Sequence, residues 1–142
     1  MSYAQLLLHG EQKLFRPESL TPMQKMILRF VVVGLVYYAF AVIEGMIMRI
    51  YQVTPLELIP PQQFFGIMTA HPLVGIFGST YSIVFGAFLF LVPFLMKKPL
   101  WSIKLANWTC ALLAVGTFTF WFAGFLTEYA PLYTLYWPLP AD

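Results

Sequence analysis

Charged side chains are scarce in this chain. Of its 142 residues only 10 % are charged, whereas 60 % are hydrophobic and 18 % are aromatic. A soluble domain has about a quarter charged residues, so the composition excludes an ordinary soluble protein and indicates an integral membrane protein. The formal net charge of +2 is too small, and the basic residues too dispersed, to indicate a nucleic-acid-binding protein.

Other absences narrow the possibilities further. Cys110 is the only cysteine and lies in an apolar run, which excludes an internal disulfide and predicts a small packing residue. The first 25 residues contain no continuous apolar core, so no cleavable signal peptide is expected. No cysteine–histidine cluster with zinc spacing, phosphate-binding glycine loop or nucleophile elbow occurs, and we assign no catalytic residue to the chain.

What the sequence does contain is long apolar runs. The longest, residues 62–96, has no charged residue and is more than long enough to cross about 30 Å of hydrocarbon as a helix. Two further runs, 26–51 and 103–127, have membrane-spanning length, and three prolines in 52–61 separate the first two helices. We therefore predict an all-α membrane protein with three transmembrane helices, an interfacial lead-in (1–25) and an aromatic, proline-rich tail (128–142).

The basic residues predict the orientation of these helices. Arg49 alone lies near the far end of the first span, whereas the other seven lie at or before its start or around the connection between spans two and three: Lys13, Arg16, Lys25, Arg29, Lys97, Lys98 and Lys104. Basic residues concentrate on the cytoplasmic side of membrane proteins. The N-terminus is accordingly expected in the cytoplasm and the C-terminus outside.

His71 is the main candidate for chemistry. It lies near the start of the second span, and helical steps from it reach a row of small residues, Gly75, Gly78, Ser82 and Gly86. Such a row lets a flat partner, either another helix or a macrocycle, approach the backbone closely. A histidine in a membrane helix either hydrogen-bonds a neighbouring helix or binds a metal such as haem iron.

Pro72 follows His71 directly. Proline has no backbone N–H, so it leaves the carbonyl of Met68 without its helical partner and predicts a kink near the histidine. His9, the other histidine, lies in the lead-in and is expected to be an ordinary surface residue.

Glu44 and Arg49 are the charged residues in the second half of the first span. Their separation of five is unsuited to an ion pair within one helix, which needs three or four. Glu44 must therefore find a partner on another helix or act in proton or ligand binding. Arg49 is expected at the outer end, either reaching the interface or hydrogen-bonding a cofactor.

Four segments together resemble the first three helices of subunit I of the haem–copper oxygen reductases, the cytochrome c and quinol oxidase family. MIMRIY (46–51) is similar to the end of helix I, and IMTAHPLVGIF (67–77) to the helix II motif whose histidine binds haem. FLVPFLM (90–96) followed by Asn107-Trp108 resembles the passage from helix II to helix III. EYAPLYTLYWPLP (128–140) resembles the segment after helix III.

The resemblance implies specific roles for these residues. His71 would be one axial ligand of a low-spin haem, Arg49 would contact the edge of that haem, and Gly75 and Gly78 would border it. The other ring nitrogen of His71 is expected to donate to a protein acceptor. The haem would pass electrons to an oxygen-reducing site built from copper and a high-spin haem.

The chain also departs from the family pattern. Family members have about twelve helices, and the second haem ligand and the copper ligands lie in later ones. The resemblance therefore implies an N-terminal part of a split catalytic subunit, inactive alone, whose partners are the rest of subunit I, a subunit II-like chain and lipids. Leu100 stands where many members have the aspartate of a proton channel, so that channel is expected to be missing. The expected location is the cytoplasmic (inner) membrane of a prokaryote.

Three other interpretations remain open at the level of sequence. A nitric oxide reductase has the same haem-binding helix. A non-catalytic three-helix accessory subunit of a respiratory complex would use His71 only for hydrogen bonding between helices. A small transporter would place Glu44 along a path and would need to oligomerise.

Overall fold

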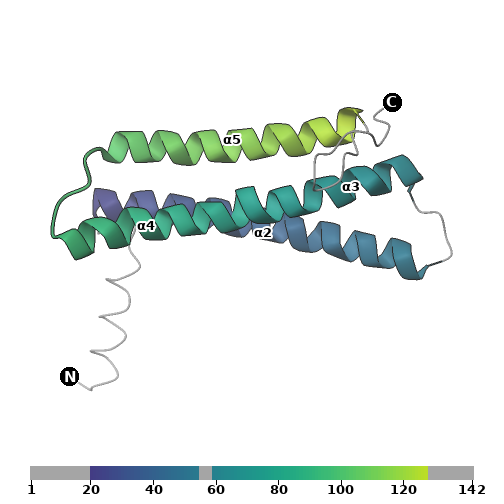
Figure 1. Cartoon of the computed structure of the whole chain (residues 1–142), viewed down its shortest axis with the longest axis horizontal. Coiled ribbons are helices and arrows are strands. Elements are labelled where there is room, and N and C mark those ends of the chain that lie inside the picture. Colours follow the sequence, from purple (N-terminus) through teal and green to yellow (C-terminus); the bar gives the residue numbers. More distant parts are fainter. Residues whose placement is uncertain (1–19, 55–58, 128–142) are drawn as a thin grey trace, which may run out of the picture.

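The computed structural model describes residues 20–54 and 59–127, which form three long antiparallel rods (Figure 1). Each rod includes a stretch long and apolar enough to cross a membrane: Pro22–Val53, Gln63–Met96 and Ile103–Ala123. The described residues contain helices and no strand. The predicted all-α fold with three membrane-spanning helices is confirmed.

The first rod is helix α2, Pro22–Val53. A capping box starts it: the backbone N–H of Gln24 donates to Thr21 Oγ1 at 3.3 Å, and that of Thr21 donates to Gln24 Oε1 at 2.8 Å. Pro22 at the first helical position lacks only an N–H that would have no helical partner. The helix thus starts ahead of the apolar run 26–51, because capping residues rather than hydrophobicity set its first turn.

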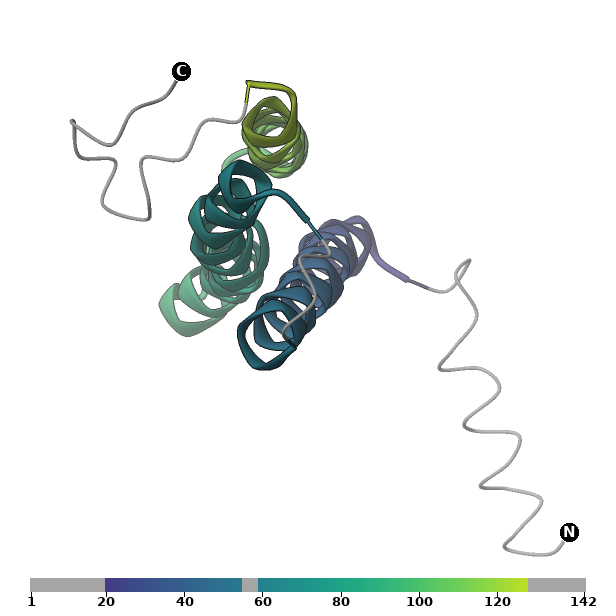
Figure 2. The same ribbon diagram turned by 90° about the vertical axis from the view of Figure 1, so that its right-hand side faces the viewer.

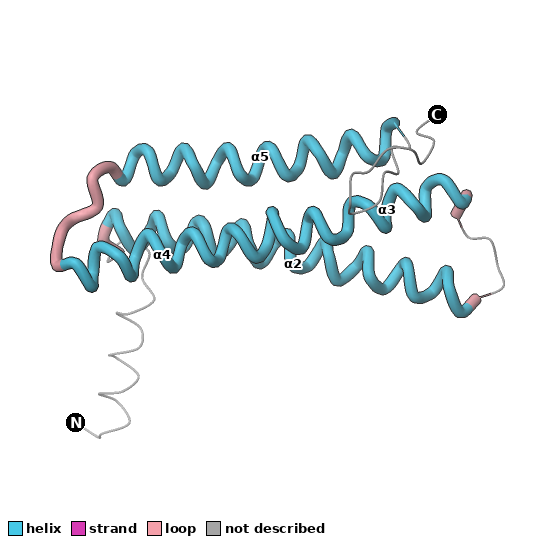
Figure 3. Tube along the Cα trace, viewed as in Figure 1, coloured by secondary structure: helices cyan, strands magenta, loops and turns pink. Residues whose placement is uncertain are grey.

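The second rod contains three consecutive segments, α3 (Pro61–Leu73), the π-helix η2 (Val74–Thr80) and α4 (Tyr81–Met96). Figure 3 shows them as one unbroken helical path. Pro72 lies one residue before the last of α3, and the widened η2 turns begin directly after it. The kink expected at Pro72 stays a prediction; the structure has a π-helix shortly after this residue, in which Thr80 Oγ1 donates to the carbonyl of Gly75 at 3.0 Å.

The row of small residues on the second rod packs against α2. A Cβ added to Gly78 would lie 2.5 Å from Tyr37 Cγ, and one added to Gly86 would lie 2.8 Å from Phe30 Cβ. The close approach is reciprocal, because a Cβ on Gly34 of α2 would lie 2.5 Å from Ile83 Cγ1. The sequence left open whether another helix or a macrocycle lies against this row of small residues. In the structure, helix α2 lies against it.

The third rod is helix α5, Ile103–Thr127, which lies beside the other two in the end-on view of Figure 2. Its first turns join a buried cluster made by Met26, Phe30, Ala106 and Cys110. The free thiol of Cys110 is therefore a packing group, as its apolar surroundings in the sequence predicted. Further along, the Tyr37 hydroxyl donates to the carbonyl of Ala114 and fixes α5 on α2.

Large apolar side chains cover the outside of the three rods. Val53, Leu95 and Leu112, one from each rod, are 76 %, 72 % and 67 % exposed. Such a surface is unfavourable in water but suits hydrocarbon or other membrane helices.

Candidate functional site

His71 lies on α3, one residue before Pro72, and its ring packs against the backbone of α2. A Cβ added to Gly45 would lie 3.3 Å from His71 Cε1 and 4.0 Å from Nδ1. The first of these distances is tighter than an ordinary contact. Glycine at position 45 therefore leaves the room that the imidazole occupies.

The imidazole borders an open cavity of about 350 Å³ at the edge of the bundle. Its lining residues come from two helices: Gly45, Met48, Arg49, Gln52 and His71. The structure thus brings together His71 and Arg49, which are distant in sequence. Arg49 Nη1 donates to Gln52 Oε1 at 3.1 Å, so a neighbour one turn along α2 holds the guanidinium group.

Neither ring nitrogen of His71 has a hydrogen-bond partner in the described part of the chain. Nδ1 is buried without a partner, whereas Nε2 is not among the buried atoms. The expected acceptor for the second ring nitrogen is thus not found within residues 20–54 and 59–127. A buried polar atom without a partner is unusual in a folded protein and calls for an explanation.

Gly75 and Gly78 lie away from this cavity. A Cβ on Gly75 would contact Ala41 Cβ at 3.8 Å, and Gly78 is buried beneath Tyr37. Neither glycine lines the cavity of His71 and Arg49. Their position in the structure is the packing seam between the second rod and α2.

Glu44 has a partner on another helix. It is only 4 % exposed, and its Oε1 accepts a 2.7 Å hydrogen bond from Trp121 Nε1 of α5. Its other oxygen, Oε2, is buried without a partner. The sequence left open a partner on another helix or a role in proton or ligand binding. The structure gives Glu44 a partner on another helix, Trp121.

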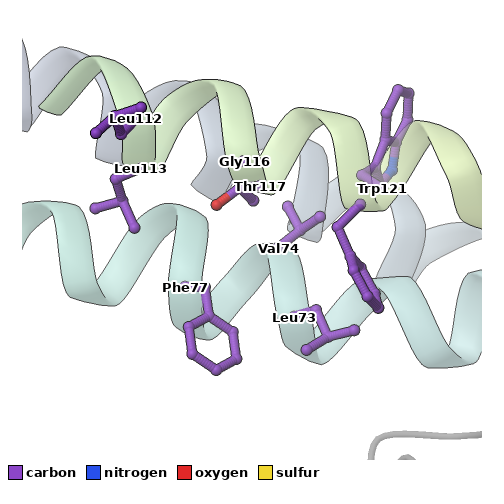
Figure 4. Close-up of a pocket in the computed structure, with 9 residues that line it drawn as sticks. Leu73, Val74, Phe77, Leu112, Leu113, Gly116, Thr117 and Trp121 are labelled. Atoms are coloured by element: carbon purple, nitrogen blue, oxygen red, sulfur yellow. The ribbon is translucent and has the colours of Figure 1, made fainter. Parts of the chain in front are cut away.

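A second cavity, of about 370 Å³, lies between the second rod and α5 (Figure 4). Its walls are almost entirely apolar: Leu73, Val74, Phe77, Leu112, Leu113, Gly116, Thr117, Phe120 and Trp121. None of these side chains is a strong metal ligand or an acid or base. Of these two cavities, only the one lined by His71 and Arg49 offers a possible metal ligand or a charged side chain.

Three residues at these sites escaped the sequence analysis. Gly45 and Gln52 lie four residues before and three residues after Arg49, so helical spacing from Arg49 was a usable signal. Trp121 is 77 positions from Glu44, and no local pattern links them.

Fold and site together define a class: a helical membrane protein that presents one imidazole and one guanidinium in a cavity open at the bundle edge. Residues 25–141 match the family model described as cytochrome c and quinol oxidase polypeptide I. The match covers most of the chain, and the chain belongs to this family, that of haem–copper oxidase subunit I. No curated protein and no solved structure matches it.

Family membership determines the broad role. Subunit I proteins are oxidoreductases of the membrane that assemble with other subunits into an oxidase complex, and the family generally binds haem and copper. The chain is accordingly a multi-pass membrane protein of an oxidase family.

Proposed function

We propose that His71 is one axial ligand of a low-spin haem and that Arg49 contacts the same haem. The observation that carries this proposal is the shared cavity: His71 and Arg49, from different helices, line one opening at the bundle edge. Within residues 20–54 and 59–127 no hydrogen bond holds His71 to a neighbouring helix, so the interhelical role expected of it in an accessory subunit finds no support there.

The residues present fit such a group. A neutral imidazole is a common axial ligand of haem iron, and Nε2 is the ring nitrogen that protein atoms do not bury. Gly45 fixes the position of the ring from one side. Arg49 supplies a fixed positive charge and several N–H donors for a negatively charged or polar substituent.

Bound haem would accept and release one electron at a time, and this chain would contribute the environment that sets its potential. The axial imidazole, the apolar surroundings and the Arg49 charge are three such influences. Gly75 and Gly78 enter the proposal as packing residues, because helix α2 covers them.

The described residues offer one imidazole, and we propose that a second haem ligand would come from a partner polypeptide. We propose that this chain acts as the N-terminal part of a split catalytic subunit. The copper and high-spin haem of the oxygen-reducing site would lie on the partner that carries the rest of subunit I, with a subunit II-like chain beside it. The assembly would lie in the inner membrane of a prokaryote.

The positions of the basic residues support an N-terminus in the cytoplasm. Lys25 and Arg29 lie in the first turns of α2, and Lys97, Lys98 and Lys104 lie where α4 passes into α5. Because the rods are antiparallel, the start of α2 and the connection from α4 to α5, which carry these five residues, lie at one end of the bundle, whereas the end of α2, which carries Arg49, lies at the other (Figure 1). The basic end would face the cytoplasm.

The experiment is the substitution His71→Ala in the complex purified from its host membrane, with His9→Ala as the control. We expect His71→Ala to remove the low-spin haem absorbance while the chain stays in the complex, and His9→Ala to leave the spectrum unchanged. An unaltered spectrum and full haem content in His71→Ala would reject haem ligation and favour an accessory role.

A further inference from the structure

Two grooves lie at the basic end of the bundle, far from the His71 cavity. The first, of about 430 Å³, is formed by Leu20, which precedes α2, and by one face of α2: Lys25, Leu28, Arg29, Val32 and Val33. The second, of about 490 Å³, is formed by one face of α5: Ile103, Lys104, Asn107, Trp108 and Ala111. Each groove combines basic side chains in the first turns of its helix with apolar side chains further along.

A hydrogen bond joins the two grooves. Arg29 Nη1 of the first groove donates to Asn107 Oδ1 of the second at 2.8 Å. This bond uses one of the five N–H donors of the guanidinium group and orients it at the seam between α2 and α5. The two grooves therefore form a single surface with Arg29 near its middle and Lys25 and Lys104 on either side.

The positive charge of this surface favours an anionic ligand. Glu44 is the only acidic residue in the part of the chain that the structure describes, and it is bonded to Trp121 away from this surface. No carboxylate within residues 20–54 and 59–127 is thus available to neutralise Lys25, Arg29 or Lys104.

The length of the grooves favours a ligand that has both a charged headgroup and a long apolar chain. Lys25 and Val33 are eight residues apart on α2, which is about 12 Å along the helix axis at 1.5 Å per residue. The groove thus extends from charged groups at the membrane surface to Val32 and Val33 at a depth that lipid chains occupy. Trp108, 58 % exposed on the second groove, has the amphipathic ring typical of the region between headgroups and chains.

We propose that this surface binds an anionic phospholipid. Its phosphate would lie at Arg29, with Lys25 and Lys104 as further cationic contacts, and its acyl chains would lie along the grooves on α2 and α5. A soluble anion would use the cations but not the apolar floor, and a purely apolar partner would leave three cations unmatched. The two features together fit a lipid that has both a charged headgroup and long chains.

The test compares lipid preference in variants of the complex reconstituted into bilayers. Binding of spin-labelled phosphatidylglycerol and spin-labelled phosphatidylcholine is measured by electron paramagnetic resonance. The double variant Arg29→Gln/Lys104→Gln removes two cations from the surface. A charge near the membrane surface changes affinity by about fivefold, so we expect the preference for phosphatidylglycerol to fall about 30-fold.

The matched control is Lys97→Gln/Lys98→Gln, which removes two charges at the same end from residues that line neither groove. We expect it to keep most of the preference. A second variant, Val32→Trp, fills the apolar floor without changing charge, and we expect it to weaken the binding of both labelled lipids. Circular dichroism and gel filtration verify that each variant is folded and assembled.

Three results would overturn the proposal. An equal loss in the control pair would show a general effect of surface charge rather than a binding site. Full preference in Arg29→Gln/Lys104→Gln, or full binding in Val32→Trp, would show that the grooves do not hold the lipid. None of these results depends on haem, so failure here is distinguishable from failure of the proposed haem site.

Discussion

Trp121 Nε1 donates a 2.7 Å hydrogen bond to Glu44 Oε1, and this bond connects α5 to α2 in the interior of the bundle. The carboxyl group is almost completely buried, and its second oxygen has no partner within the described part of the chain. Burying a polar group is costly unless it is hydrogen-bonded, so this single contact offsets much of the cost of placing Glu44 there.

Replacing Trp121 by phenylalanine tests that contact. The substitution keeps an aromatic ring beside Phe40 and Phe118 but removes the indole N–H. Leaving a buried acceptor unsatisfied costs about 1–3 kcal/mol, so we expect the free energy of unfolding to fall by about that amount. Thermal denaturation of the purified complex in detergent measures it. Trp101→Phe, at a residue 92 % exposed, is the control and is expected to have no measurable effect.

A double-mutant cycle separates the hydrogen bond from the packing of the indole. Glu44→Leu removes the carboxyl group, so adding Trp121→Phe to it leaves no unpaired acceptor. We expect the two substitutions together to cost less than the sum of their separate effects. Additive costs would show that the bond contributes little and that packing of Trp121 dominates.

The seam between the second rod and α2 predicts an effect of Gly78→Ala. The new Cβ would lie 2.5 Å from Tyr37 Cγ, so the two helices must separate or Tyr37 must move. Overpacking of this kind costs about 1–3 kcal/mol. Gly116→Ala is a matched control, because nothing lies within 4 Å of a Cβ at that position, and we expect it to be neutral or slightly stabilising. Equal thermal stability of the two variants would contradict the close packing described here.

Gly45 provides a graded test of the haem proposal without touching the ligand itself. A Cβ at this position lies 3.3 Å from His71 Cε1, and the larger side chain of valine would push the ring away from α2. We expect Gly45→Ala to shift the low-spin haem spectrum slightly and Gly45→Val to reduce it strongly. Optical difference spectra of the complex measure both, with Gly116→Ala as the control. A normal spectrum in Gly45→Val would mean that His71 does not depend on this contact.

Arg49 should influence the potential of the proposed haem. A nearby positive charge favours the reduced state, so Arg49→Gln is expected to lower the midpoint potential, by roughly tens of millivolts for an interaction of about 1 kcal/mol. Arg49→Lys keeps the charge but loses the paired donors of the guanidinium group and is expected to have a smaller effect. Spectroelectrochemical titration gives both values. A midpoint potential that is the same in Arg49→Gln and the unmodified protein would place Arg49 away from the haem.

Composition and apolar length were sufficient to predict the three helices, because a bilayer permits few alternatives for such runs. The cavity shared by His71 and Arg49 was anticipated only through the resemblance to a family, since no spacing rule relates residues on different helices. Glu44 illustrates the same limit. Its burial required a partner, but which of the aromatic or polar residues on α5 supplied it depended on how the helices pack.

The π-helix was also beyond the sequence argument. Pro72 predicts a kink, because it has no backbone N–H. A helix can accommodate that missing donor either by a kink or by a π-helical turn, and the same residues precede both, so the sequence does not distinguish them. The row of small residues similarly fitted either a helix or a macrocycle. Steric fit with Tyr37 and Phe30 of α2, which depends on tertiary packing, decided between them.

The π-helix η2 (Val74–Thr80) lies between the two parts of the second rod that pack on α2. A π-helical turn holds more residues than an α-helical turn, so η2 accommodates an additional residue without rotating α4 relative to α3. α4 thereby packs on α2 through Gly86 and Phe30, while α3 places the His71 ring beside Gly45. The direction in which the imidazole points therefore depends on the conformation of this segment as well as on the histidine itself.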